Sequence, residues 1–594
     1  MRILGISDGM TGGAALLEDG QLVYAVHEER LIRAKMATGF PAASIRHLLE
    51  DTRKRPEDFD AIAVGTVNEF FRKEAVAYDG WLLREQAPTK ELLLNVSSAL
   101  NQVVGAGPWL RQSYYGLKSF MGRSRRQAIQ MLLRQEWGFA CPVRFIDHHL
   151  AHAASAYFTS GLRHATVVTM DGAGDHSSSR VYLMKDERFQ RLWNVSSFDS
   201  IGNYYAYVTH LCGFKAQKHE GKITGLAAYG RPVYAEILKR FIASDGDGIV
   251  NRGRVFYWAA VKALERALPQ PFDKADLASS MQQVLEEVGC AYVRRWVERT
   301  GCGDLALAGG VFANVKLNQR IHELPGVRSV FIHPGMGDEG LPVGAAFALA
   351  ATTAAASGRI MLPVTLQDVY LGPDYTEREM EQAIEASGLR AQYVADIERR
   401  IAELLAEGAV VARFNGRMEY GPRALGNRTI LYQATDPTVN DWLNKRLNRT
   451  EFMPFAPVTL AEHADRCFEG LDGARYAAQF MTITVNCTPG MKQHCPAVVH
   501  VDGTARPQLI DERTNPSYYR IVEEYRKLTG LPSLINTSFN MHEEPIVCTP
   551  SDAIQSFQDG GLDYLALGNF LLTHPVRRIR PGEQSVAHGR VSRT

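Results

Sequence analysis

Three segments with the composition of buried strands each run into a loop of glycine and aspartate, and this pattern constrains the fold most. The segments are residues 165–170, 304–308 and 328–333, separated by helical patterns. Asp171 follows the first segment directly, and Asp338 lies in the loop after the last. Strands that alternate with helices favour an α/β fold, in which ligands bind at the carboxyl ends of the strands. The sequence therefore predicts an α/β sheet with a ligand site at this edge.

The first residues of the chain predict a small antiparallel unit that opens this domain. Strand patterns at 2–7, 13–18 and 21–26 are separated by short turns. The turn at 8–13 is rich in small residues, so its backbone N–H groups can approach phosphate oxygens. Taken alone this is a weak signal, because any hairpin can carry glycines.

The length of 594 residues predicts about two to four domains. A helix at 397–407 and a strand at 409–414 begin a second domain, and residues 351–366 have the composition of a linker. The predicted parts are a first domain at 1–355 with a helical insertion at 67–135, a second domain at 365–577 and a flexible tail at 578–594.

The insertion at 67–135 carries a run of basic residues on helical patterns. We interpret this run as a solvated helical face; the alternative is a lid or an acceptor-binding element. The basic residues are Arg111, Lys118, Arg123, Arg125, Arg126 and Arg134.

Composition and charge exclude several classes of protein. The formal net charge is +1, which predicts no nucleic-acid and no membrane partner. No apolar run approaches the roughly 20 residues that span a bilayer, and the amino terminus does not read as a signal peptide. The 8 cysteines are scattered without metal-binding spacing, which favours a reducing compartment and a cytoplasmic location.

A pair of histidines four residues apart is the sharpest local motif. His148 and His152 lie in a helical pattern, so their side chains share one helical face and can bind one metal ion. Asp171 and Asp338 end strands of the same predicted sheet and strengthen this interpretation. Two imidazoles with carboxylates suit Fe(II) or Zn better than Ca. The alternative, that both histidines only pack in the core, stays open.

Arginines are dense in the second domain. Arg417, Arg423 and Arg428 fall within one loop of glycine and proline residues, and further basic residues follow at Lys445, Arg446, Arg449 and Arg506. Guanidinium groups bind phosphate oxygens with charge and planar geometry, although surface arginines are the simpler explanation. The segment that begins at Asn536 adds neutral polar groups after a strand.

These motifs, in order, resemble the O-carbamoyltransferase family, which includes nodulation protein U and carbamoyltransferases of antibiotic biosynthesis. The resemblance covers roughly residues 1–65 and 143–575. The segments that carry it are HHLAHAASAYF, MDGAGD, GKITGLAAYG, AGGVFAN, NGRMEYGPRALGNR, PFAP and NTSFN.

The resemblance implies an N-terminal actin-like (ASKHA) fold with duplicated α/β halves, similar to the universal threonylcarbamoyl-tRNA transferase, followed by an α+β YrdC-like domain. It implies an ATP-dependent carbamoyltransferase. The YrdC-like site makes carbamoyl adenylate from ATP and carbamoyl phosphate and releases pyrophosphate. The first domain then transfers the carbamoyl group to a hydroxyl of a small-molecule acceptor and releases AMP.

The resemblance also implies roles for individual residues. His148, His152, Asp171 and Asp338 are the expected catalytic and metal residues, with Fe(II) or another divalent ion, and Mg²⁺ accompanies ATP. The residues expected to bind ATP, carbamoyl phosphate or the adenylate are Gly172, Gly174, Lys222, Gly309, Gly310, Asn314, Arg423, Arg428, Arg446, Arg449, Arg506 and Asn536.

The chain departs from the family pattern at two places. Many members have a His-Asp pair in the first turn, where this chain has Met10 and Thr11. Near PFAP, a family Lys is replaced by Asn448 and a family Arg by Met453. Neighbouring Lys445, Arg446 or Arg449 can supply the missing charge. The acceptor is therefore not defined by the sequence.

Two other classes of function compete with this interpretation. An actin-like sugar kinase would use the glycine-aspartate loops for ATP but leaves the arginines and the histidine pair without a role. A nucleotide-dependent binding protein would show no turnover. Release of pyrophosphate rather than ADP separates a carbamoyltransferase from a sugar kinase. A homodimer is an oligomeric state that the sequence leaves open.

Overall fold

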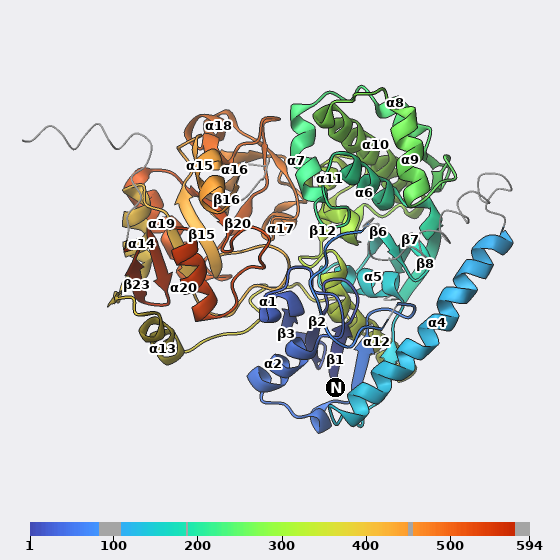
Figure 1. Ribbon diagram of the computed structural model, residues 1–594, viewed down its shortest axis with the longest axis horizontal. Helices are drawn as coiled ribbons and strands as arrows, with labels where there is room; N and C mark the ends of the chain where they lie inside the picture. The colour runs from blue at the N-terminus through green and yellow to red at the C-terminus, as the bar shows by residue number, and fades with distance from the viewer. Residues whose placement is uncertain (70, 82–107, 186–187, 449–454, 576–594) are drawn as a thin grey trace, which may run out of the picture.

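Two five-stranded sheets with the same strand order form the N-terminal part of the chain (Figure 1). In each, three antiparallel strands are followed by two strands that pair in parallel beside the first: β3-β2-β1-β4-β5 and β8-β7-β6-β11-β12. The first sheet contains β1 Arg2–Ser7, β2 Gly13–Glu18, β3 Gln21–His27, β4 Ala61–Val64 and β5 Val143–Phe145. The second contains β6 Ala165–Gly174, β7 Ser177–Lys185, β8 Arg188–Ser196, β11 Asp304–Ala308 and β12 Ser329–Ile332. The predicted duplicated α/β halves of an actin-like fold are confirmed.

The structure is a computed structural model that describes residues 1–69, 71–81, 108–185, 188–448 and 455–575. The predicted tail at 578–594 and the predicted site residue Arg449 lie outside this range.

Two helices fill the space between the sheets. Each follows the last strand of its half: α5 spans His148–Phe158 and α12 spans Leu341–Ala356. They cross closely, because a Cβ on Gly344 would lie 1.8 Å from the Ala151 carbonyl oxygen. Residues Asp338–Ala356 are long and apolar enough to cross a membrane by composition alone. In the structure, α12 packs on α5 and on both neighbouring strands β1 and β2, as a core helix does.

Further helices cover the second half and carry residues that later line the site. The longest, α10, packs against α6, α7, α8 and α11. These helices are α6 Ile201–Leu211, α7 Glu220–Leu226, α8 Ala235–Lys239, α9 Trp258–Ala267, α10 Lys274–Thr300 and α11 Val315–His322. The first half carries α1 Glu28–Ile32 and α2 Ala42–Thr52, and a two-stranded ribbon pairs β9 Ile242–Asp245 with β10 Gly248–Asn251.

The C-terminal part is an eight-stranded mixed sheet with the order β13-β23-β22-β14-β15-β21-β16-β20. Its strands are β13 Ala391–Tyr393, β14 Val411–Phe414, β15 Arg428–Gln433, β16 Ala456–Leu460, β20 Gln508–Ile510, β21 Ser533–Ser538, β22 Tyr564–Leu567 and β23 Phe570–Thr573. A small sheet adds β17 Phe468–Glu469, β18 Val485–Cys487 and β19 Thr504–Ala505. The principal helices are α13 Glu377–Ser387, α14 Ile397–Ala406, α15 Val439–Arg446, α19 Pro516–Thr529 and α20 Pro550–Asp559. This is the expected α+β class.

Two local expectations were wrong. β6 does not stop at residue 170, because its ladder with β7 resumes after a bulge and runs to Gly174. α12 continues to Ala356, into the expected linker, since its alanines favour helix. Asn314 caps α11, its side chain accepting from Leu317 N.

The insertion contains a 28-residue helix, α4 Pro108–Gln135, that runs along the N-terminal part (Figure 1). Arg125 is buried and its guanidinium bonds both carboxylate oxygens of Asp8, with Nε 3.0 Å from Oδ2. The expected solvated face is therefore wrong for Arg125, while Arg123 and Arg134 are exposed. The side chains of Arg111 and Lys118 lie outside the described residues. The buried guanidinium of Arg125 thus links the turn after β1, which contains Asp8, to the helix of the insertion.

We expect Arg125→Met to lower the free energy of unfolding by about 3–5 kcal/mol, because it leaves the Asp8 carboxylate buried without its partner. Urea unfolding followed by circular dichroism measures the loss. Arg123→Met removes an exposed arginine from the same helix and serves as the control. Equal stability of the two variants would show that the buried pair contributes nothing.

Candidate metal centre and the two cavities beside it

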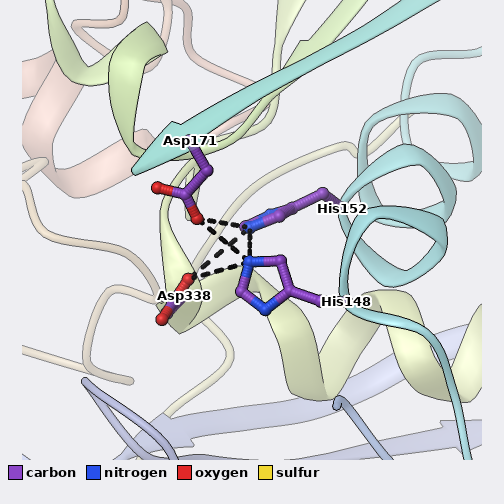
Figure 2. A group of neighbouring side chains, drawn as sticks. All are labelled: His148, His152, Asp171 and Asp338. Atoms are coloured by element: carbon purple, nitrogen blue, oxygen red, sulfur yellow. Dashed lines mark hydrogen bonds and ion pairs between the residues drawn. The ribbon is translucent and has the colours of Figure 1, made fainter. Parts of the chain in front are cut away.

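Four side chains converge on one point between the two sheets (Figure 2). His148 and His152 are one turn apart on α5, and their Nε2 atoms lie 3.1 Å from each other. Asp171 comes from β6, and its Oδ2 lies 3.0 Å and 3.4 Å from these two nitrogens. Asp338 follows β12, and its Oδ1 lies 3.5 Å from each nitrogen. The structure thus brings together all four residues that the sequence predicts as metal ligands.

These distances fit the coordination of a divalent ion. Ligands about 2.1 Å from an ion, at angles of about 90–110°, lie about 3.0–3.4 Å from one another. The four donor atoms all lie within 4.8 Å of one another. Two imidazole nitrogens and two carboxylates suit Fe(II) or Zn. The residues therefore fit the predicted metal.

Neighbouring residues hold the histidine helix in place. The backbone N–H of His148 donates to Asp175 Oδ2 at 2.8 Å, and the Asp147 side chain caps the helix through Leu150 N. Arg180 pairs with Asp147 at 2.9 Å and so anchors this cap. Gly174 is required here, because a Cβ would lie 2.1 Å from the His148 ring.

The electrostatics of the cluster favour a cation. Burial opposes the charged form of His148, but the carboxylates of Asp338 and Asp171 raise its pKa to about 9. Burial likewise acts to raise the pKa of Asp171, but hydrogen bonds from His148 and His152 hold it well below its usual range. The carboxylates thus stabilise positive charge at this point. A metal ion would take the place of protons on the imidazoles.

The cluster opens into a cavity of about 470 Å³, called the large cavity. Gly172, Gly310 and Asn314, which the sequence predicts at the nucleotide, line it. Gly309 precedes Gly310 and does not line the cavity itself. Its φ is 109°, and a Cβ there would lie 2.1 Å from the Met170 carbonyl oxygen, so the position requires glycine. Arg423 of the C-terminal part also lines the large cavity.

The C-terminal loop that carries Arg423 is fixed by backbone contacts. Glu419 Oε1 accepts from the N–H groups of Leu425, Asn427 and Arg428 at 2.7–3.0 Å, which closes the loop into a tight arch. Buried Arg30 donates to the Gly421 carbonyl at 2.9 Å and ties the arch to the first half. Arg423 thus reaches the metal side of the molecule from another domain.

Sequence reasoning missed several ionisable residues of the large cavity. His27 ends β3, Glu29 lies in α1, and Glu220 begins α7. Burial lowers the pKa of His27 to about 4 and raises that of Glu220 to about 7. His27 directly follows the predicted strand at 21–26, and its place at a strand end was the signal that could have found it.

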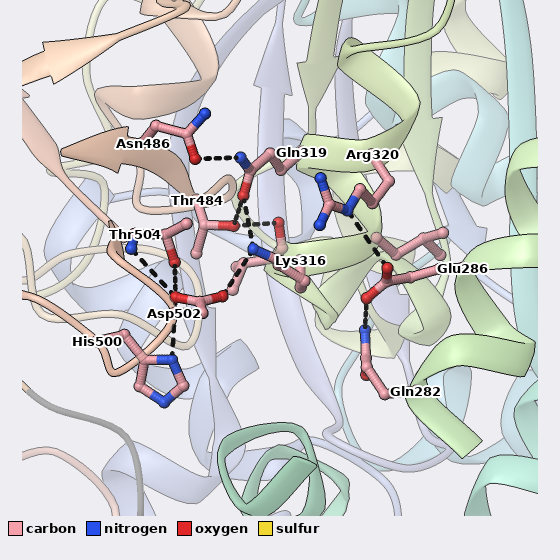
Figure 3. A network of polar contacts seen from close by, with 12 residues as sticks. Gln282, Glu286, Lys316, Gln319, Arg320, Thr484, Asn486, His500, Asp502 and Thr504 are labelled. Carbon is pink, nitrogen blue, oxygen red and sulfur yellow. Dashed lines mark hydrogen bonds and ion pairs between the residues drawn. The ribbon is translucent and has the colours of Figure 1, made fainter. Parts of the chain in front are cut away.

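A second cavity of about 290 Å³, called the small cavity, lies between the N-terminal and C-terminal parts. Arg506 lines it from the C-terminal side, next to His500 and Asp502. Lys316 of α11 lines it from the N-terminal side and donates to Asp502 Oδ2 at 2.7 Å (Figure 3). This ion pair joins the two parts of the chain.

Asn536 lies between the two arginine loops rather than in a cavity. Its Nδ2 donates to the Ala424 carbonyl at 3.1 Å and to Gln508 Oε1 at 2.7 Å. It therefore links the loop of Arg423 with the segment of Arg506.

The other predicted binding residues line neither cavity. The Arg428 guanidinium lies 3.6 Å from the centre of the Phe414 ring and donates to backbone carbonyls of its own loop. Buried in this way, Arg428 stabilises the loop rather than facing a ligand. Arg446 stacks on Trp442. Lys222 lies in α7 with its ammonium 5.9 Å from the Phe214 ring.

A duplicated α/β fold with four side chains that could hold a metal ion is joined to an α+β part, which presents Arg423 to one cavity and Arg506 to the other. The chain belongs to the carbamoyltransferase family: the family models described as Carbamoyltransferase N-terminus and Carbamoyltransferase C-terminus match residues 2–347 and 402–574. This membership makes the protein a transferase.

Several curated proteins are similar over nearly the whole chain. An uncharacterized protein, sll1178 of Synechocystis, is 31% identical over 98% of each chain. Nodulation protein NolNO of Sinorhizobium fredii is 32% identical over 94% of this chain and 78% of its own. Nodulation protein U of Rhizobium tropici is 27% identical over 96% of each chain.

Proposed function

We propose that the protein is an O-carbamoyltransferase that works in two half-reactions. ATP and carbamoyl phosphate form carbamoyl adenylate with release of pyrophosphate, and a small-molecule hydroxyl then takes the carbamoyl group with release of AMP. The observation that carries the proposal is the adjacency of two cavities, one beside the metal cluster and one lined by Arg506.

The small cavity and its arginine suit the first half-reaction. Guanidinium groups bind phosphate oxygens in two-pronged hydrogen bonds, which neither lysine nor a neutral donor reproduces. Arg506 lines this cavity, and Asn536 holds its segment at a fixed place relative to the Arg423 loop. Adenylation turns a poor carbamoyl donor into one with a good leaving group.

The large cavity suits the second half-reaction. The acceptor oxygen attacks the carbonyl carbon, and the C–O bond between that carbon and a phosphate oxygen breaks. AMP leaves with the electron pair, and the hydroxyl proton passes to solvent. His148, His152, Asp171 and Asp338 would hold a divalent ion, which supplies Lewis-acid stabilisation of negative charge. Enclosure of the cavity between two domains limits access of water to a labile intermediate.

We expect pyrophosphate release that depends on both ATP and carbamoyl phosphate. A coupled pyrophosphate assay measures it, and mass spectrometry of candidate hydroxyl compounds detects the added carbamoyl group. Omission of carbamoyl phosphate is the control. ADP as the product would instead indicate the kinase alternative, and absence of any turnover would indicate a binding protein.

A further inference from the structure

The two cavities share one wall, and four uncharged polar side chains form it. Thr224 of α7 lines both cavities. Gln282 of α10 lines the small cavity, and Tyr205 of α6 and Asn314 line the large one. Four segments far apart in the sequence therefore meet where the cavities adjoin.

Hydrogen bonds close this wall. The Tyr205 hydroxyl lies 2.8 Å from Thr224 Oγ1 and 3.0 Å from Gln282 Oε1. Asn314 Nδ2 donates to Gln282 Oε1 at 2.8 Å, and Gln282 Nε2 donates to Asn314 Oδ1 at 3.2 Å. The amides of Gln282 and Asn314 thus bond each other in both directions. The wall is a closed network, not a gap.

One member of the wall has a second partner on the side of the small cavity. Gln282 Nε2 also donates to Glu286 Oε1 at 2.8 Å (Figure 3). Asn314, by contrast, is fixed as the cap of α11 through Leu317 N. If the Gln282 amide turns away from Asn314, one of its two N–H donors can keep the hydrogen bond to Glu286, while the other donor and the amide oxygen become free to bond a passing ligand.

The chemistry of the wall suits the passage of an anion. Carbamoyl adenylate carries a negative phosphate, and an arginine or lysine in the wall would retain it. Hydroxyl and amide groups offer hydrogen bonds of about 0.5–1.5 kcal/mol each, weak enough to exchange during passage. A wall of hydrocarbon would instead force the phosphate to lose its hydrogen bonds.

We propose that this wall is the gate through which carbamoyl adenylate passes from the small cavity to the large one, with Gln282 as its moving residue. The proposal rests on the proposed function. It assigns Thr224, Gln282, Tyr205 and Asn314 as positioning residues that control transfer of the intermediate without taking part in either chemical step.

The test uses labelled carbamoyl adenylate that the enzyme makes from α-phosphate-radiolabelled ATP and carbamoyl phosphate, with no acceptor present. Thr224→Phe should block passage through the wall, because Thr224 lines both cavities and the larger ring occupies the space between them. Its pyrophosphate release is measured in parallel, because Thr224 also lines the small cavity, and the escape of label is expressed per pyrophosphate formed. Rapid gel filtration measures the labelled AMP that has left the protein, per pyrophosphate formed. This ratio should rise at least about tenfold, because intermediate that cannot reach the large cavity escapes into water and hydrolyses to AMP.

Two further variants make the result decisive. Glu298→Phe places the same ring on an exposed position of α10 that lines neither cavity, and it should behave as wild type. Gln282→Glu keeps the size of the side chain, adds a negative charge beside Glu286, and should also raise the escape of label. This variant replaces Thr224→Phe if that protein does not fold.

The outcomes separate the gate from the proposed function. No pyrophosphate from wild type would overturn the proposed function. Pyrophosphate release with the same escape of label in wild type, Thr224→Phe and Gln282→Glu would overturn the gate alone.

Discussion

His152→Ala is expected to abolish carbamoyl transfer while pyrophosphate release continues. The variant removes one of two imidazoles from the four-donor cluster, whose closest donors lie 3.0–3.5 Å apart. Loss of residues that only support a metal ligand costs about 10–100-fold in affinity, so loss of a ligand should cost at least about 100-fold. Metal content, measured by mass spectrometry of the purified protein, should fall accordingly.

His149→Gln is the matched control for this experiment. His149 is buried on the same helix, but its Nδ1 contacts Thr169 Oγ1 at 2.8 Å and takes no part in the cluster. Its variant should keep both metal and transfer. A His152→Ala protein that retains its metal and transfers normally would show that the histidine pair only packs in the core.

Arg506→Ala is expected to lower carbamoyl-phosphate-dependent pyrophosphate release at least about tenfold. The variant removes charge-assisted hydrogen bonds of about 1.5–3 kcal/mol, and 1.4 kcal/mol corresponds to a factor of ten. Arg423 lines the large cavity, so Arg423→Ala should lower transfer more than pyrophosphate release. Arg506→Lys should not restore the rate, because an ammonium lacks the planar fork. The rate is followed by the coupled pyrophosphate assay.

Arg513→Ala is the control, since Arg513 belongs to the same domain and its side chain is 94% exposed. Its rate should equal that of wild type. A wild-type rate of pyrophosphate release in Arg506→Ala would remove the small cavity from the first half-reaction, and wild-type transfer in Arg423→Ala would remove Arg423 from the second.

The meeting of these four side chains could be predicted from spacing and topology. The spacing of His148 and His152 defines one helical face, and Asp171 and Asp338 lie at the carboxyl ends of β6 and β12, which both pair with β11. Residues at the carboxyl ends of parallel strands meet at one edge of a sheet. The expected role of the four residues as metal ligands came from the family resemblance.

The cavity wall could not be predicted, because its residues share no spacing and no strand end. Tyr205, Thr224 and Gln282 come from three different helices. Only the packing of α10 against α6, α7 and α11 brings them together. Likewise, Arg428 and Arg125 looked like ligand or surface arginines, since their sequence context does not reveal that tertiary packing buries them.

The four metal donors do not belong to one half of the actin-like domain. His148 and His152 lie on the helix that leaves the first sheet, whereas Asp171 and Asp338 leave strands of the second. In space, however, α5 packs on β6 and β11 of the second sheet and on α12, so the donors separate only if α5 itself shifts. By thermodynamic linkage, any ligand that shifts α5 must change the affinity for a metal ion by the factor with which the ion changes the affinity for that ligand. A bound ion would then report on the position of α5 as well as take part in chemistry.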